Sequence, residues 1–91
     1  MNYLRLRHRH PHVTFHTAQA GDPVYDRFGN VVGAVAAADD LSVTLAIQGA
    51  ATPWRITLNF VGENRDALRP SARTIAAIPG LRDEMFFLNR K

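Results

Sequence analysis

Three histidines at alternate positions come closest, by residue type and spacing, to a chemical site. On an extended segment His8, His10 and His12 would lie on one face, about 6–7 Å apart. Imidazole is the commonest metal ligand in proteins, and His16 could complete a four-ligand Zn²⁺ site. Pro11 interrupts the spacing, however, and no second ligand cluster follows it. We therefore expect a solvated basic segment here, with no bound metal and no cofactor.

The arginines that alternate with these histidines could bind phosphate. Arg5, Arg7 and Arg9 are the only charged side chains in residues 1–16, and basic and acidic residues balance in the rest of the chain. A basic segment of this kind can contact nucleic-acid phosphates. The same charges also suit docking onto an acidic neighbouring protein subunit. The sequence does not decide between these two partners. Three arginines are too few to define a nucleic-acid-binding surface, and no exposed aromatic pair is available to stack on bases.

No pattern in the sequence indicates catalysis. The adjacent acids Asp39-Asp40 and Asp83-Glu84 would point to opposite faces of a strand, so neither pair makes a catalytic dyad. No serine stands in a nucleophile motif, no glycine loop precedes a helix, and there is no cysteine. We expect a protein that is not an enzyme.

One aromatic residue stands where a partner could reach it. Phe28 lies within Asp26–Asn30, a sequence that predicts a tight turn because Asp, Gly and Asn are turn formers. An aromatic side chain at a turn tip could insert into a partner, since such residues are enriched among interface hot spots. Alternatively, it could fold back onto the sheet.

Length and composition indicate one small folded domain. The chain has 91 residues, of which 46% are hydrophobic, too many for a disordered chain. No apolar run approaches the roughly 20 residues that span a bilayer. The charged start lacks the apolar region of a signal peptide. We expect no membrane partner.

Alternating apolar residues predict the strands. Residues 21–37 should form a hairpin around the Asp26–Asn30 turn, with Gly33 marking a bulge or a close backbone approach. Residues 41–48 should form a strand with Leu41, Val43, Leu45 and Ile47 inward and with Ser42, Thr44 and Gln48 outward. Residues 54–61 should form the next strand, with Trp54, Ile56, Leu58 and Phe60 inward.

The last third of the chain is less regular. Residues 62–70 predict a loop with a possible helical turn at 66–69, residues 71–78 suit helix or strand, and residues 84–89 should form a closing strand. The sum is a mainly β fold: a small barrel of five or six short antiparallel strands, with at most one short helix.

The N-terminal residues should be separate from this barrel. Before Pro11 the apolar residues occupy even positions, whereas Val13, Phe15 and Thr17 occupy odd ones. A shift of one residue reverses the faces of a strand, and proline is confined to edges and bulges. We therefore divide the chain into a basic N-terminal arm, residues 1–11, and a single small β-barrel domain, residues 12–91.

Three short motifs resemble known families. The pattern GxxVxDxxGxxVGxV of residues 21–35 resembles the opening hairpin of PRC-barrel domains, which implies an SH3-like barrel that serves as an interaction module. Thr14-Phe15 followed by DRFGN at 26–30 is similar to the start of tailed-phage head-completion (stopper) proteins. AGDPV at 20–24, continuing to GAVA at 33–36, is similar to capsid cement proteins.

These resemblances agree on a small, non-enzymatic β protein that binds a larger assembly. The leading expectation is a minor virion component, of the head-tail connector or capsid cement type, with other protein subunits as partners in a homo- or hetero-oligomer. The implied location is a virion or the cytoplasm. The alternative is a nucleic-acid-binding SH3-like module that uses the basic arm.

Overall fold

The computed structural model describes residues 12–57 and 65–90. Arg5, Arg7, Arg9, His8 and His10, and with them the arm as a whole, lie outside this range, as do Leu58 and Phe60. The elements, in chain order, are β1 (Pro23–Tyr25), β2 (Val31–Ala38), β3 (Ser42–Ile47), β4 (Trp54–Thr57), β5 (Ala67–Leu68), α2 (Ala72–Ala77) and β6 (Phe86–Phe87).

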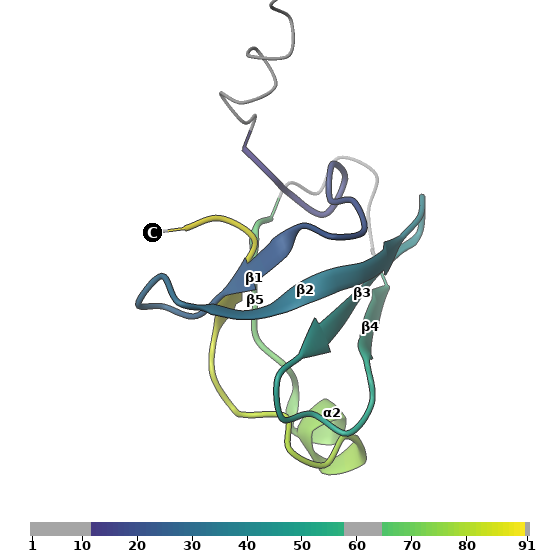
Figure 1. Ribbon diagram of the computed structural model, residues 1–91. Coiled ribbons are helices and arrows are strands. Elements are labelled where there is room, and N and C mark those ends of the chain that lie inside the picture. The colour runs from purple at the N-terminus through teal and green to yellow at the C-terminus, as the bar shows by residue number, and fades with distance from the viewer. Residues whose placement is uncertain (1–11, 58–64, 91) are drawn as a thin grey trace, which may run out of the picture.

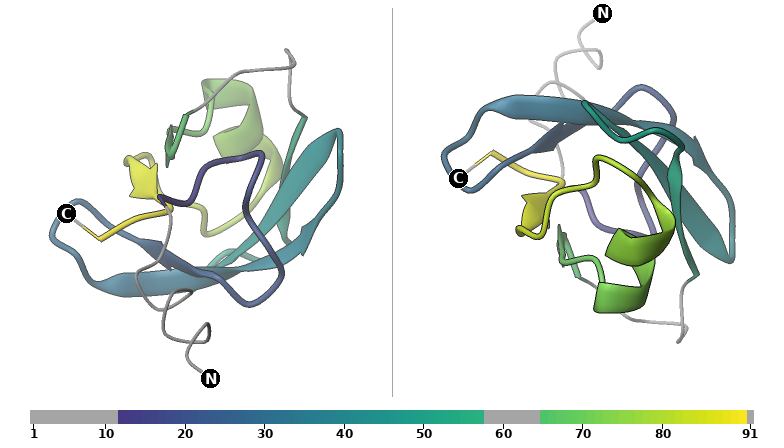
Figure 2. Two further views of the ribbon diagram at one scale, coloured as in Figure 1. Left: turned by 90° about the horizontal axis from the view of Figure 1, so that it is seen from above. Right: turned by 90° about the horizontal axis from the view of Figure 1, so that it is seen from below.

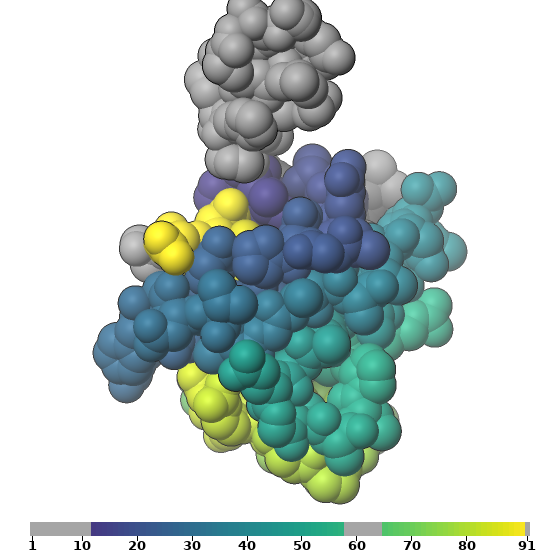
Figure 3. Space-filling view, viewed as in Figure 1, coloured from purple at the N-terminus to yellow at the C-terminus, as the bar shows by residue number. Residues whose placement is uncertain are grey.

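All six strands belong to one antiparallel sheet, in the order β4-β3-β2-β1-β6-β5. The sheet curls into a half-barrel, and α2 lies at its lower end below the β3–β4 loop (Figures 1 and 2). This confirms the mainly β fold with six short antiparallel strands and one short helix. The turns at the two ends of β2 project from opposite sides of the molecule (Figure 3).

The curl starts in β2, the longest strand. Its register against β1 shifts opposite Val24 and Tyr25, and its register against β3 shifts between Val35 and Ala37. Bulges of this kind bend a strand and increase its twist. The extra residue of a bulge in β2 also shifts the alternation of inward and outward side chains by one position. Val32 and Val35 are therefore both buried although they are three residues apart.

Gly33 is required by a close backbone approach, as the sequence predicts. A Cβ at this position would collide with the Ala46 carbonyl oxygen on β3. The register shift falls beside it, at Val32, so both features expected at this glycine are present.

The start of β3 differs from the prediction. Val43, Leu45 and Ile47 are buried as expected, but Leu41 is exposed and Ser42 is buried. Asp39 explains the difference, because its Oδ1 accepts hydrogen bonds from the backbone N–H groups of Leu41 and Ser42 at 2.8 Å each. Residues 39–42 therefore form a turn, and Leu41 lies at its tip instead of on the inner face.

The predicted alternation of residues 13–17 is also wrong. Thr14 and Phe15 are both buried, whereas Thr17 is exposed. A local turn overrides the alternation, since Thr17 N–H donates to the Thr14 carbonyl at 3.1 Å and Thr14 N–H donates to Thr17 Oγ1 at 2.8 Å.

The last third contains more structure than the sequence predicts. Residues 67–68 form β5 within the expected loop, where they pair with β6. The ambiguous residues 71–78 are helical over Ala72–Ala77, because Ser71 Oγ caps the first turn by accepting the Thr74 N–H at 3.1 Å. The closing strand is confirmed, but it is limited to Phe86–Phe87.

The hydrophobic core fills the concave side of the half-barrel. Trp54 is buried, as predicted for a core residue, and its ring meets that of Phe86 edge-on, with centroids 6.0 Å apart. The other fully buried large side chains come from three further segments of the chain: Phe15, Val24, Val43 and Leu45.

A backbone contact ties the α2–β6 connection to the β3–β4 loop. Ala51 N–H donates to the Pro79 carbonyl at 2.8 Å, and a Cβ on Gly80 would collide with the Gly49 carbonyl. Gly80 also has a φ of 85°, which side-chain-bearing residues rarely adopt.

We expect Gly80→Ala to destabilise the fold more than Gly21→Ala. Gly21 has a φ of 98° but open space at its Cβ position, so alanine there adds only backbone strain of about 1–2 kcal/mol. Gly80→Ala adds a steric clash to the same strain, for about 1–3 kcal/mol more. Urea denaturation of both variants measures the difference. Equal losses would mean that the contact with Gly49 does not constrain the fold.

Candidate functional site

Two of the seven site residues expected from the sequence lie in the described part of the chain. They are His12, where the described chain begins, and Phe28, in the β1–β2 turn. The other five, Arg5, Arg7, Arg9, His8 and His10, fall outside it.

His12 is held by side chains from the far end of the sequence. Its Nε2 lies 2.5 Å from Asp66 Oδ2, and the same carboxylate oxygen accepts a hydrogen bond from Asn89 Nδ2 at 3.1 Å. No group of three or more metal-ligating side chains occurs among residues 12–57 and 65–90. The described contacts therefore give His12 a structural partner.

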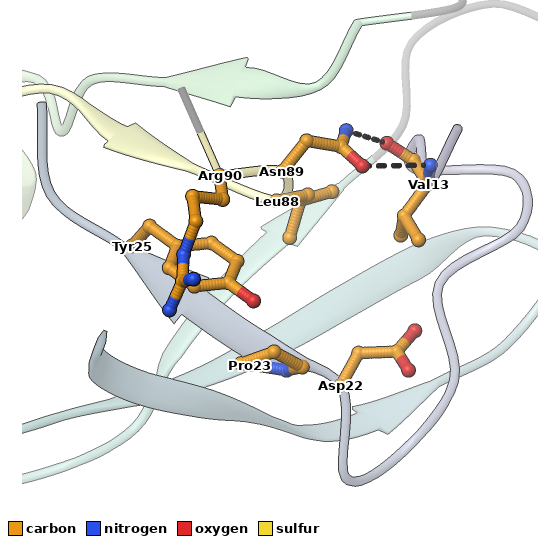
Figure 4. Close-up of a pocket in the computed structure, with 7 residues that line it drawn as sticks. All are labelled: Val13, Asp22, Pro23, Tyr25, Leu88, Asn89 and Arg90. Carbon is orange, nitrogen blue, oxygen red and sulfur yellow. Dashed lines mark hydrogen bonds between the residues drawn. The ribbon is translucent and has the colours of Figure 1, made fainter. Parts of the chain in front are cut away.

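Asn89 also fixes the backbone next to His12. Its Nδ2 donates to the Val13 carbonyl at 2.6 Å, and its Oδ1 accepts the Val13 N–H at 3.1 Å (Figure 4). This paired contact works like one rung of a sheet ladder. It attaches the start of the described chain to the segment that follows β6.

A shallow pocket of about 330 Å³ lies below Asn89 (Figure 4). Arg90 covers one side, with its guanidinium 5.6 Å from the centroid of the Tyr25 ring. The amide of Asn89 is used by Val13, so it is not available to orient a ligand. The lining of the pocket is mainly apolar and comprises Val13, Asp22, Pro23, Tyr25, Leu88, Asn89 and Arg90.

Phe28 lies at the tip of a turn that a single carboxylate organises. Asp26 Oδ1 accepts the backbone N–H of Phe28 at 2.8 Å and that of Asn30 at 2.9 Å. Asp26 N–H in turn donates to the Asn30 carbonyl at 2.9 Å, closing the hairpin. The hydrogen bond from the Asn30 backbone is the main cause that lowers the pKa of Asp26.

The Phe28 side chain points away from the sheet and is 72% exposed. It does not fold back onto the core. The guanidinium of Arg27 lies 4.7 Å from its ring centroid, a cation–π contact that orders both side chains. Of the two arrangements predicted for Phe28, the structure therefore shows the exposed side chain that a partner could reach.

A groove of about 410 Å³ runs beside this ring. We call it the Phe28 groove, and define it by its lining residues: Arg27, Phe28, Arg69, Asp83, Glu84 and Met85. Met85 is 37% exposed and supplies a second apolar surface. The groove lies where the β1–β2 hairpin passes the segments that flank β5 and β6.

The lining of the Phe28 groove carries balanced charges, with Arg27 and Arg69 against Asp83 and Glu84. Arg69 pairs with Asp83 at 3.2 Å, and Arg82 pairs with Glu84 at 2.8 Å. These pairs account for the acids Asp83 and Glu84. Within residues 12–57 and 65–90 no carboxylate pairs with Arg27.

The sequence analysis missed Met85 and Arg69 as parts of this site. A signal for Met85 was present, because Phe86 and Leu88 alternate as buried positions and leave Met85 on the outer side. No local pattern points to Arg69, which reaches the groove only because β5 pairs with β6.

The chain matches no protein-family model, no curated protein and no solved structure in these comparisons. In the described part of the chain, no helix has the length and apolar character needed to cross a membrane.

We expect the Phe28 turn to loosen as the pH falls below about 4, the usual pKa range of a free Asp. The folded turn lowers the pKa of Asp26, so its stabilising contribution is present above that range and is lost as the pH falls through the folded value. Hydrogen exchange of the Phe28 and Asn30 amides, followed by NMR against pH, measures this. Unchanged protection of both amides in an Asp26→Ala variant would show that the carboxylate does not hold the turn.

Proposed function

We propose that this protein is a non-enzymatic assembly component that binds a neighbouring protein subunit through the Phe28 groove. The observation that carries the proposal is the exposed Phe28 ring, held in place by Arg27 beside a second apolar residue, Met85. The class that fits the sequence resemblances is a minor virion component of the head-tail connector or capsid cement type.

The side chains of the groove are those that commonly dominate protein interfaces. Aromatic residues, methionine and arginine are enriched there, and a few of them supply most of the binding energy. The Arg27 guanidinium stacks on the Phe28 ring, and Asp26 holds the backbone of Phe28 at the turn tip. Both contacts reduce the conformational entropy that is lost when a partner covers these side chains.

The alternative function, binding of nucleic acid through Arg5, Arg7 and Arg9, uses residues outside the described range. In the described part, Arg69 and Arg82 are paired with carboxylates. Arg27 is stacked on the Phe28 ring, an arrangement that suits a protein contact better than a phosphate track.

We expect Phe28→Ala to abolish recovery of the protein's partner in a pull-down from the native source, without loss of folding. Truncating a central interface aromatic typically weakens binding by about 2 kcal/mol or more, roughly 30-fold. Far-UV circular dichroism checks the fold, and protein and nucleic acid in the eluate are measured separately.

Arg27→Ala and Arg73→Ala form a matched pair for the same pull-down. Arg73 is exposed on α2, away from the groove, so its loss should leave recovery unchanged while loss of Arg27 weakens it. Partner recovery that is insensitive to Phe28 and Arg27 would contradict the proposal. Nuclease-sensitive recovery that depends on residues 1–11 would favour the nucleic-acid alternative.

A further inference from the structure

A second exposed tip lies at the other end of β2. We call it the Leu41 tip, and define it as Asp39, Asp40 and Leu41. The Leu41 side chain is 69% exposed, comparable to Phe28. Asp39 organises this turn as Asp26 organises the other one, since its Oδ1 also accepts the Ser42 hydroxyl at 3.2 Å. The chain therefore displays apolar side chains on two carboxylate-braced turns.

The two tips have complementary chemistry. The Phe28 groove offers apolar surface beside Arg27, which has no carboxylate partner within the described residues. The Leu41 tip offers an aliphatic side chain beside Asp40, for which the described residues supply no ion pair. Arg55 lies close enough to Asp39 to help lower its pKa, so the surplus negative charge of the tip rests on Asp40.

The two surfaces cannot meet within one molecule. They lie at opposite ends of β2, an eight-residue strand that at about 3.3 Å per residue separates them by more than 20 Å. Figures 1 and 3 place the β1–β2 and β2–β3 turns on opposite sides of the domain. Complementary surfaces that face away from each other can pair only between molecules.

We propose that the Phe28 groove of one copy receives the Leu41 tip of a second copy, in head-to-tail contact. Leu41 then covers Phe28 and Met85, and Asp40 faces Arg27. This inference rests on the proposed function, because it names the subunit that occupies the groove.

Charge favours this arrangement over a symmetric dimer through either end. A two-fold contact brings the same patch of both subunits together. Two tips would bring only aspartates together, and two grooves would have to pair Arg27 with Asp83 or Glu84, which already pair with Arg69 and Arg82. Head-to-tail contact opposes unlike charges at every interface. Each added copy still has a free groove or a free tip, so further copies can bind until a filament forms or a ring closes.

A contact between two turn tips is small, and the pairwise affinity should be correspondingly weak. Sedimentation velocity of the full chain, up to about 1 mM, is expected to show a weight-average sedimentation coefficient that rises with concentration. Phe28→Asp and Leu41→Asp alter only exposed side chains, and each should weaken self-association at least about tenfold.

Mixing these two variants gives the decisive measurement. Phe28→Asp keeps an intact tip and Leu41→Asp keeps an intact groove, so an equimolar mixture should form a 1:1 dimer and nothing larger. Arg27→Glu and Asp40→Arg provide a charge-based test of the same contact. Each alone should fail to associate, whereas the double variant should associate again because the charges are exchanged.

A full chain that stays monomeric at this concentration would overturn the proposal. Self-association that is insensitive to Leu41→Asp, or a variant mixture that stays monomeric while the wild type associates, would do so as well. The pull-down distinguishes failure of this proposal from failure of the proposed function. Recovery of a different protein by a monomeric chain, dependent on Phe28, would keep the function and reject only the second copy as partner.

Discussion

The contact between Trp54 and Phe86 is the constraint on which the rest of this structure depends. Trp54 belongs to β4, an end strand of the sheet, and Phe86 belongs to β6, four strands away in the sheet order. A flat sheet would hold these strands well apart, because neighbouring strands are spaced about 4.8 Å. Their rings can meet only if the sheet curls. The two register shifts in β2 and the absence of a side chain at Gly33 allow that curl.

The same curl creates the candidate site. It brings β6 alongside β1, where Tyr25 pairs with Phe87, and so places the segment just before β6 next to the β1–β2 turn. Asp83, Glu84 and Met85 then line a groove that also contains Phe28. The site is therefore a consequence of how the half-barrel folds, although none of its side chains belongs to the core.

The correct predictions of the fold came mostly from residue patterns within single segments of the chain. The hairpin at 21–37, the inward residues Val43 and Leu45, and the core position of Trp54 all follow from alternation and turn formers within one segment. The errors arose where one side chain overrode the alternation, as Asp39 does for Leu41 and Thr14 and Thr17 do for their neighbours. Phe28 could be identified as a candidate from its turn alone. Arg69 could not, because its position depends on the pairing of β5 with β6, which no local pattern encodes.

The turns themselves explain why Phe28 and Leu41 remain outside the core. In each turn an aspartate binds the backbone N–H of the apolar residue, which fixes that residue at the tip, directed away from the concave face. Moving either side chain inward would break these hydrogen bonds, and the concave face is already filled by the side chains around Phe86. Burial of these two residues within their own domain is therefore opposed by the hydrogen bonds that form the turns. A second molecule can cover them with both turns intact. Arg27 beside Phe28 and Asp40 beside Leu41 form no ion pair within the described residues, and their opposite charges favour the pairing of unlike ends.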